Sequence, residues 1–380
     1  MRIKRLSDTN QKITSHKSKW WFACLLCLVT VLTVGGCQAA DASGATDSKA
    51  DIADADTQTK PVIICTLFPQ YDFARQIYGD EADVRMLLAP GQESHMYDPT
   101  PQDMIEISNA DMFIYTGDEM EPWAAQIVES LDGVKVLDLS KYVDLESEEE
   151  HEENEIQEAD EDVHSDDEDV HSEDEDVHGD DEDVHDEVDT HEDVHESHHH
   201  HNHEHSYDPH FWLNLDNAAK MAEAIADASA ELPVKDRAAL ADRAGDYVAQ
   251  LHAMDEKYKT MIADSSRTDI VFAGRFAYGY LISHYGLTYE TVYQSCSAEA
   301  DPSIYDMTHV IDYINEHQVH TIFYEELSSG RVAQTISQDT GASMKVLSTA
   351  HNVSKEDFEN GITFLDIMQR NYDVLEEALN

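Results

Sequence analysis

Residues 144–206 limit what this 380-residue chain can fold into, because they contain no lysine or arginine and consist mainly of aspartate, glutamate and histidine. Within them, Asp-Glu-Asp-Val-His recurs with a seven-residue period, in repeats that end at His164, His171, His178 and His185. A coiled coil needs two apolar positions in each heptad, whereas this repeat offers one valine among like charges. The segment cannot bury enough apolar surface to order itself, so we expect a disordered loop inserted into a folded chain.

The same loop holds thirteen of the chain's 22 histidines. They are densest at its end, at His198, His199, His200, His201, His203 and His205. Dense histidine tracts bind divalent metal ions, because neutral imidazole is a common metal ligand. The alternative is an acidic solubilising spacer, in which this many histidines would be accidental. We therefore interpret residues 144–206 as a metal-binding loop whose individual sites are weak.

The first 60 residues indicate export and anchoring. A basic leader precedes the apolar run from Trp20 to Val34, which is too short for a membrane-spanning helix and has the pattern of a signal peptide over residues 1–36. Val34-Gly35-Gly36-Cys37 resembles a bacterial lipobox, which makes Cys37 the expected lipidation site; an ordinary signal peptide is the alternative. Residues 37–60 then form a flexible tether. We expect a protein anchored by lipid to the outer face of the cell membrane.

Charge and motifs exclude some function classes. The formal net charge is −56, and such a surface would repel the phosphate backbone of nucleic acids. The chain has no Gly-x-Ser-x-Gly elbow and no phosphate-binding P-loop, so we expect a binding protein rather than an enzyme. Cys65 and Cys296 are the cysteines that remain after the anchor. An exported pair can form a disulfide, but their spacing does not decide whether these two do.

Strands alternate with helices on both sides of the loop, which predicts an α/β fold of two Rossmann-like lobes. Predicted strands at 62–67, 83–89, 111–115 and 134–139 form the first lobe, residues 61–143. Those at 270–273, 287–292, 321–324 and 344–347 form the second lobe, residues 265–380. Residues 207–264 join the lobes through a helix over 216–232, capped by Asp216, and a long apolar-striped helix over 234–263. A final helix is expected from Ser354 nearly to Asn380.

Two histidines lie in turns rich in proline or glycine, which would hold a ligand rigidly. One is His95, in Pro90-Gly91-Gln92-Glu93-Ser94-His95, and the other is His210, in Asp208-Pro209-His210. His351 follows the last predicted strand, as His95 follows an earlier one. Ligand sites in parallel α/β sheets lie at the carboxyl ends of strands, so both positions suit a metal ligand.

Several motifs, in this order, resemble the zinc- and manganese-binding lipoproteins of bacterial ABC importers, the ZnuA/AdcA-like group. The motifs are Pro90-Gly91 with His95, residues 97–101, 208–213, 278–280, 285–287 and 298–303, and Glu325 after a strand. The resemblance covers residues 61–380. It implies two lobes bridged by a long helix, with metal in the cleft between them. It also implies a monomer that delivers zinc to an ABC permease and its ATPase.

The resemblance further implies four metal-ligand positions. His95 and His210 match the first two, and His351 falls at the fourth. Arg275 stands at the third position, where the family carries histidine or glutamate, and a guanidinium cannot ligate a cation. Either Arg275 turns outward to pair with a carboxylate, or the site is completed differently.

The remaining ligand and the metal stay open. Water, Glu299, Glu325 or Cys296 could complete a three-histidine set, with Glu299 as the candidate additional ligand. Three imidazoles favour Zn²⁺, which is our principal expectation, whereas an oxygen-rich site would favour Mn²⁺. Two other functions remain as alternatives: an extracellular metal buffer or cell adhesin without a transport role, and a metallohydrolase with an open zinc position.

Overall fold

The computed structural model describes residues 59–94, 97–147, 207–293 and 302–380. Residues Thr57–Asn380 form one compact unit. Several predicted functional positions lie outside the described residues: Cys37, His95, Cys296, Glu299 and the histidines of the 144–206 loop. Within the described ranges, no helix is both long enough and apolar enough to cross a membrane.

The first lobe is a four-stranded parallel sheet in the order β2-β1-β3-β4. Its strands are β1 (Val62–Cys65), β2 (Asp83–Met86), β3 (Met112–Tyr115) and β4 (Lys135–Asp138). The connecting helices are α1 (Phe68–Tyr78), α2 (Pro101–Ser108) and α3 (Pro122–Val128). The predicted start of α2 is confirmed, since Thr100 and Asp103 form a capping box around Pro101. Short 3-10 turns follow α1 and β4, as η1 (Gly79–Glu81) and η2 (Leu139–Tyr142).

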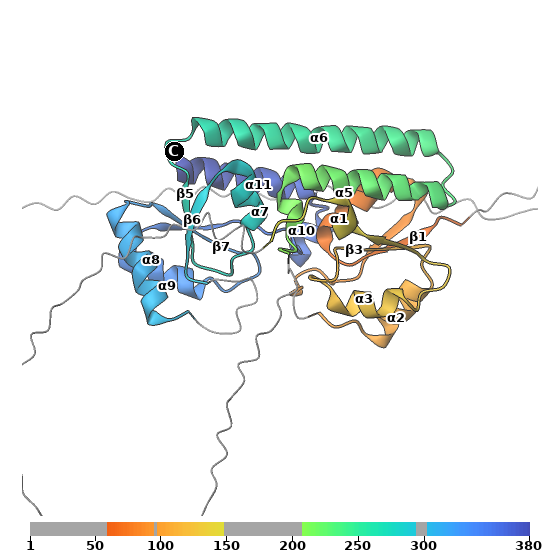
Figure 1. Ribbon diagram of the computed structural model, residues 1–380, viewed down its shortest axis with the longest axis horizontal. Helices are drawn as coiled ribbons and strands as arrows, with labels where there is room; N and C mark the ends of the chain where they lie inside the picture. The colour runs from red at the N-terminus through yellow and green to blue at the C-terminus, as the bar shows by residue number, and fades with distance from the viewer. Residues whose placement is uncertain (1–58, 95–96, 148–206, 294–301) are drawn as a thin grey trace, which may run out of the picture. The chain divides into compact units, whose positions relative to one another are not determined.

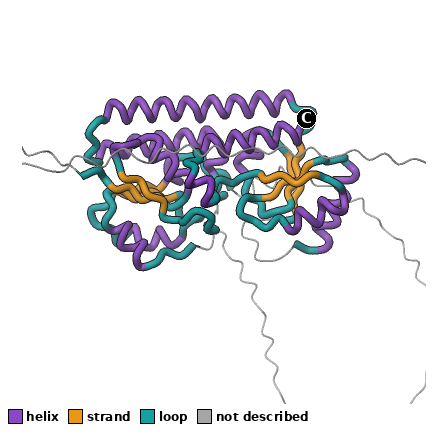
Figure 2. The backbone as a smooth tube through the Cα atoms, turned by 180° about the vertical axis from the view of Figure 1, so that it is seen from behind, coloured by secondary structure: helices purple, strands orange, loops and turns teal. Residues whose placement is uncertain are grey.

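The second lobe repeats this topology, as a parallel sheet in the order β6-β5-β7-β8. Its strands are β5 (Asp269–Phe272), β6 (Thr288–Thr291), β7 (Thr321–Tyr324) and β8 (Ser343–Val346). The connecting helices are α7 (Gly279–Tyr285), α8 (Ile304–Glu316) and α9 (Arg331–Thr340). Figure 2 shows the two sheets as separate groups of strands beneath the same layer of helices. The predicted two-lobed α/β fold is confirmed.

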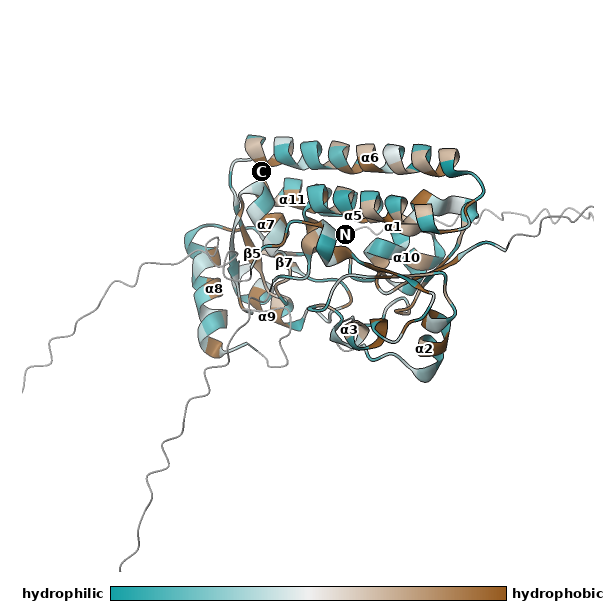
Figure 3. Cartoon of the chain, turned by 45° about the vertical axis from the view of Figure 1, so that its right-hand side comes forward, coloured by the Kyte–Doolittle hydropathy of each residue, from teal (hydrophilic) through white to brown (hydrophobic). Residues whose placement is uncertain are grey.

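Helix α6 (Arg237–Asp264) runs along both lobes and packs against α1, α5 (Leu215–Ala228) and α11 (Phe364–Leu379) (Figure 1). Its 28 residues correspond to a length of about 42 Å. The predicted apolar stripe is buried at Leu240, Ala244, Tyr247, Leu251, Tyr258 and Met261, and Met254 is partly buried. Figure 3 shows the other side of the stripe as hydrophilic colour along the same helix. Two 3-10 turns, η3 (Phe211–Leu213) and η4 (Ser229–Glu231), flank α5.

Two predicted helix ends are wrong. Helix α5 is capped by Asn214 rather than Asp216, because the Asn214 side chain accepts from the backbone N–H groups of Asp216 and Asn217. The predicted final helix is two helices, α10 (Lys355–Glu359) and α11. They are separated at Gly361, whose φ of 75° is a left-handed conformation that ends a helix. Thr363 then starts α11 with a new capping box.

Each sheet is covered on both faces, and one core is shared by the two lobes. Smaller apolar clusters lie under α2 and α3 in the first lobe and under α8 and α9 in the second. The main cluster continues from the first sheet through α1, α5, α6 and α11 to the second sheet. Residues 352–364, although near the C-terminus, contact the first lobe: Phe364 donates its N–H to Asp72, and its ring meets that of Phe73 edge-on at 5.0 Å.

Candidate metal site

His210 lies in the turn between the loop and η3, with its ring 1% exposed. Its Nδ1 is 2.5 Å from Oδ1 of Asp208, and the same oxygen accepts the backbone N–H of His210 at 2.9 Å. A carboxylate only accepts hydrogen bonds, so Nδ1 carries the proton. The tautomer that results leaves Nε2 as the nitrogen with the lone pair. A carboxylate behind an imidazole is the arrangement that orients histidine ligands in metal sites.

His351 has a matching arrangement in the second lobe, in the loop after β8. Its Nδ1 is hydrogen-bonded to the hydroxyl of Thr349, which in turn donates to the Glu326 carboxylate at 2.7 Å. Burial raises the pKa of Glu326, and the hydrogen bonds that its carboxylate accepts from Thr349 oppose that rise. Ala350, between the two partners, has a φ of 59°, an uncommon conformation for a residue with a side chain. Again Nε2 is the nitrogen that would ligate a metal.

The two imidazoles face each other. Their ring centroids are 4.6 Å apart and their planes are nearly perpendicular, at 89°. Trp212, fully buried, packs edge-on to both rings and donates its indole N–H to the Thr349 carbonyl at 2.8 Å. The structure therefore brings together two of the three histidines that the sequence analysis selected. The third, His95, is outside the described residues.

Hydrogen bonds join the segment that leads to residue 95 to the His351 loop. Gly91 donates its backbone N–H to Val353 O at 2.8 Å, and the side-chain amide of Asn352 donates to the carbonyls of Ala89 and Gln92. The N-terminus of α1 makes a further link, because Phe68 N–H donates to His351 O at 3.1 Å. The loops of both lobes are thus tied together at the carboxyl edges of the sheets, where the sequence placed the site.

A cavity of about 60 Å³ lies beside His351 and is lined by residues of both lobes, among them Glu93, Ser94, Arg275, Glu325, Glu326 and Thr349. Arg275 does not turn outward. Its Nη1 is 3.7 Å from Glu93 Oε1 and its Nε is 3.7 Å from Glu325 Oε1, so it bridges the lobes. The expected pairing with a carboxylate is present, but the expected outward turn is not.

Sequence reasoning missed the groups behind the imidazoles. Asp208, Thr349 and Glu326 were not selected, although a signal was present. In both cases the hydrogen-bond partner of Nδ1 lies two residues before the histidine, at Asp208 for His210 and at Thr349 for His351. The Glu326 contact could not be read from the sequence, because it joins two loops that only the sheet brings together.

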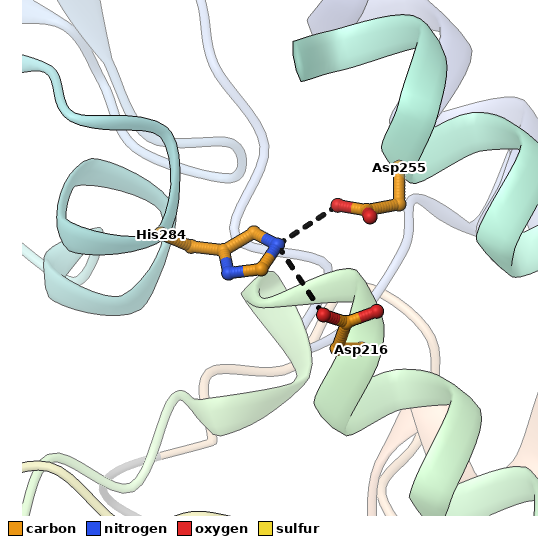
Figure 4. Close-up of side chains that lie close together, drawn as sticks. All are labelled: Asp216, Asp255 and His284. Carbon is orange, nitrogen blue, oxygen red and sulfur yellow. Dashed lines mark hydrogen bonds and ion pairs between the residues drawn. The ribbon is translucent and has the colours of Figure 1, made fainter.

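A second group of ligand-type side chains joins α5, α6 and α7. Atoms of Asp216, Asp255 and His284 lie within 4.8 Å of one another, and Figure 4 shows the imidazole pointing between the two carboxylates. However, the Lys259 ammonium already lies 2.6 Å from Asp255 Oδ2. The ammonium group at this distance already neutralises the carboxylate charge that a metal ion would otherwise neutralise. We interpret this group as an ion-pair junction between helices.

Comparisons with known proteins identify the family. The profile of the family described as ZnuA, zinc-uptake complex component A, periplasmic, matches residues 63–179 and 167–378. The high-affinity zinc uptake system protein ZnuA of Bacillus subtilis (strain 168) is 30% identical over 365 residues, covering 95% of this chain and 98% of that protein. The chain belongs to the ZnuA family.

Other ZnuA-like proteins are more distant. The zinc-binding lipoprotein AdcA of Streptococcus pneumoniae serotype 4 is 28% identical over 324 residues, which cover 83% of this chain and 55% of AdcA. The chain thus spans about half the length of that relative. The crystal structure of the metal-dependent lipoprotein YcdH from Bacillus subtilis superposes with a TM-score of 0.63 at 26% identity, covering 84% of this chain and 100% of that chain. The ZnuA family consists of zinc-uptake components and is not an enzyme family.

Proposed function

We propose that this protein is an extracytoplasmic zinc receptor that captures Zn²⁺ in the cleft between its lobes and delivers it to an ABC permease. The observation that carries the proposal is the facing pair His210 and His351, each with Nδ1 bonded and Nε2 set for ligation. His95, matched to the family pattern, is the proposed third ligand. A three-imidazole set suits zinc better than manganese, which prefers oxygen ligands.

Zinc titration of the mature protein tests this proposal. The wild type, His210→Ala and His351→Ala are compared by competition with a chromophoric chelator and by measuring bound metal. His320→Ala, an exposed histidine on the second lobe, is the matched control. We expect one tight zinc in the wild type and the control, lost in both cleft variants. Tight zinc retained in both cleft variants would refute the cleft site.

Delivery and anchoring are part of the same proposal. Cys37 is the proposed lipid attachment point, and the name of AdcA as a lipoprotein supports it. The permease and its ATPase are the proposed partners, supported by membership of a zinc-uptake family. The receptor is proposed to act as a monomer, without catalysis. Mass spectrometry of the membrane-extracted protein tests the anchor, and growth of a deletion strain under zinc chelation tests uptake.

Two alternative functions are tested separately, one with the deletion strain and one with the purified protein. A metal buffer or adhesin without a transport role would leave zinc-limited growth of the deletion strain unchanged. A metallohydrolase would show activity in a substrate screen of the zinc-loaded protein. His191–His195 in the loop has the His-Glu-x-x-His spacing of zinc hydrolases, so the same screen tests this motif.

A further inference from the structure

Arg275 occupies an unusual place for a cation. It lies in the loop between β5 and α7, at the carboxyl edge of the second sheet, and lines the same cavity as His351. Its guanidinium spans Glu93 of the first lobe and Glu325 of the second, at 3.7 Å from each. The side chain is 34% exposed, against 15% for Glu325, so the more buried charge of the pair is the carboxylate.

The Glu325 carboxylate is fixed by a backbone hydrogen bond and by close packing against Gly274. Its Oε2 accepts the backbone N–H of Arg275 at 3.1 Å. A Cβ at Gly274 would lie only 1.8 Å from the same oxygen, so the absence of a side chain at residue 274 makes room for it. Burial raises the pKa of Glu325, while the charge of Arg275 and the backbone hydrogen bonds lower it. The Glu325 carboxylate is therefore held beside Arg275 by the backbone N–H of Arg275, by the space at Gly274 and by the guanidinium of Arg275.

The pairing of Arg275 with Glu93 and Glu325 affects which metal ions the cavity can bind. Carboxylate oxygens are preferred ligands of Mn²⁺ and other hard cations, whereas imidazole suits Zn²⁺. A guanidinium stays protonated at every physiological pH and cannot itself coordinate a metal. It therefore takes two carboxylates out of competition for metal at the wall of the cavity. It also adds a positive charge, which disfavours binding sites that depend on charge more than on directed nitrogen ligands.

We propose that Arg275 is a selectivity determinant of the cleft: by pairing with Glu93 and Glu325 it denies carboxylate ligands to Mn²⁺ and leaves an imidazole site for Zn²⁺. This inference rests on the proposed zinc-binding function. Arg275 contacts the two glutamates and acts on the metal only through them. Its effect is accordingly on the ratio of two affinities rather than on zinc affinity alone.

The test compares Zn²⁺ and Mn²⁺ affinities of the wild type and Arg275→Gln, by chelator competition for zinc and by calorimetry for manganese. We expect Mn²⁺ affinity to rise on the order of 10-fold or more, the scale on which groups around metal ligands act, with a much smaller change for Zn²⁺. The visible spectrum of bound Co²⁺ is a second measurement, expected to shift from a four-coordinate to a higher-coordinate form.

Four further variants isolate the cause. In Arg275→Gln/Glu93→Gln/Glu325→Gln both released carboxylates are absent, so Mn²⁺ affinity should return to the wild-type value. Arg275→Lys keeps a cation between the glutamates and should keep the wild-type preference. Arg275→Lys also provides a background for the test if Arg275→Gln does not fold. Adding Glu325→Gln to Arg275→Lys should then leave the preference for Zn²⁺ over Mn²⁺ unaltered. Arg331→Gln, at the start of α9 in the same lobe, is the matched control; Arg331 forms no ion pair with a described residue.

The outcomes separate the two proposals. Equal losses of both metals in Arg275→Gln would make Arg275 a structural bridge and overturn the inference, as would an unchanged Zn²⁺/Mn²⁺ ratio in a wild type that binds zinc. A wild type without tight zinc would refute the proposed function itself, and the inference with it. A raised Mn²⁺ affinity that persists without Glu325 and without Glu93 would also overturn it.

Discussion

The ring of His210 meets the ring of His351 at 89° with 4.6 Å between centroids, although one follows the acidic loop and the other follows the last strand of the second lobe. Each ring is oriented by a partner two residues earlier, Asp208 or Thr349. Two separate segments thus use the same local arrangement to orient imidazole rings that lie in contact. Such convergence is expected of a binding site and would be unusual for two buried core histidines.

The Asp208 carboxylate should therefore affect metal affinity. Asp208→Asn keeps a hydrogen-bond acceptor for Nδ1 but removes the charge behind His210. We expect zinc affinity to fall about 10- to 100-fold, with little change in the fold. Chelator competition measures the affinity, and thermal unfolding checks the fold. Asp227→Asn, an exposed position on α5, is the control. An unchanged affinity would mean that Asp208 only shapes the turn.

The lowered pKa of Asp255 predicts that part of the free energy of unfolding is lost in acid. Burial raises its pKa, but hydrogen bonds from His284, Lys259 and Tyr285 outweigh burial and bring the pKa to about 2. Because this is below the value of an unfolded aspartate, the group stabilises the fold above about pH 4 by on the order of 2 kcal/mol. That contribution is lost as the pH falls towards 2. Chemical unfolding should show the advantage of the wild type over Asp255→Asn shrinking from pH 5 to pH 2.5.

The raised pKa of Glu121 predicts the opposite trend, a stability that falls as the pH rises. Burial raises its pKa to about 7, although hydrogen bonds from Thr66, Gly117 and Thr116 oppose the rise. A raised pKa favours the folded state at low pH, so stability is lost as the pH rises from about 4.5 through 7. In Glu121→Gln the amide can donate to Thr66 and its oxygen can accept from Thr116 N–H. The variant should gain about 3 kcal/mol on the wild type between pH 5 and pH 8. A constant difference across this range would contradict the prediction.

Two glycines offer a matched pair of substitutions. A Cβ at Gly274 would collide with the Glu325 carboxylate, whereas a Cβ at Gly245, inside α6, meets nothing within 4 Å. Gly245→Ala should stabilise the protein by about 1 kcal/mol, because alanine favours the helix and restricts the unfolded chain. Gly274→Ala should destabilise it and displace Glu325. Thermal unfolding of both variants checks the contrast, and equal effects would mean that Glu325 moves aside without cost.

The residues at the two ends of the acidic loop are paired with each other, so the loop can be deleted between them. Ser147 and Tyr207 form an isolated antiparallel bridge, and Asp208 N–H donates to Glu146 O at 3.1 Å, so both ends of the loop are paired. Replacing residues 148–206 with Asn-Gly should close a hairpin at this point. We expect the tight zinc to be retained and the additional weak zinc to be lost, as measured by bound metal per protein. Loss of the tight site would show that the loop contributes a ligand.

Much of the fold was predictable because local signals agreed. The alternation of apolar strands with helices and the capping box at Thr100 needed only neighbouring residues. His210 and His351 could be selected from turns and strand ends, and the family resemblance assigned both to one site, but the contact between their rings is visible only in the fold. The break at Gly361 was missed because the apolar spacing continues across it. The pairing of Arg275 with Glu93 and Glu325 joins three distant loops, so only the assembled sheets reveal it.

The segment after His351 has a consequence for how the chain acquires its structure. Arg75 of α1 bonds to the carbonyl of Ile362, Asp72 accepts the N–H of Phe364, and the ring of Phe358 stacks on Tyr71. The first lobe is therefore completed by residues that lie 287 to 292 positions further along the chain. A ribosome must synthesise all of the intervening polypeptide before this packing can form. Late closure of this kind slows folding and keeps a nascent chain unfolded for longer, which is the state in which a secretion channel can thread it.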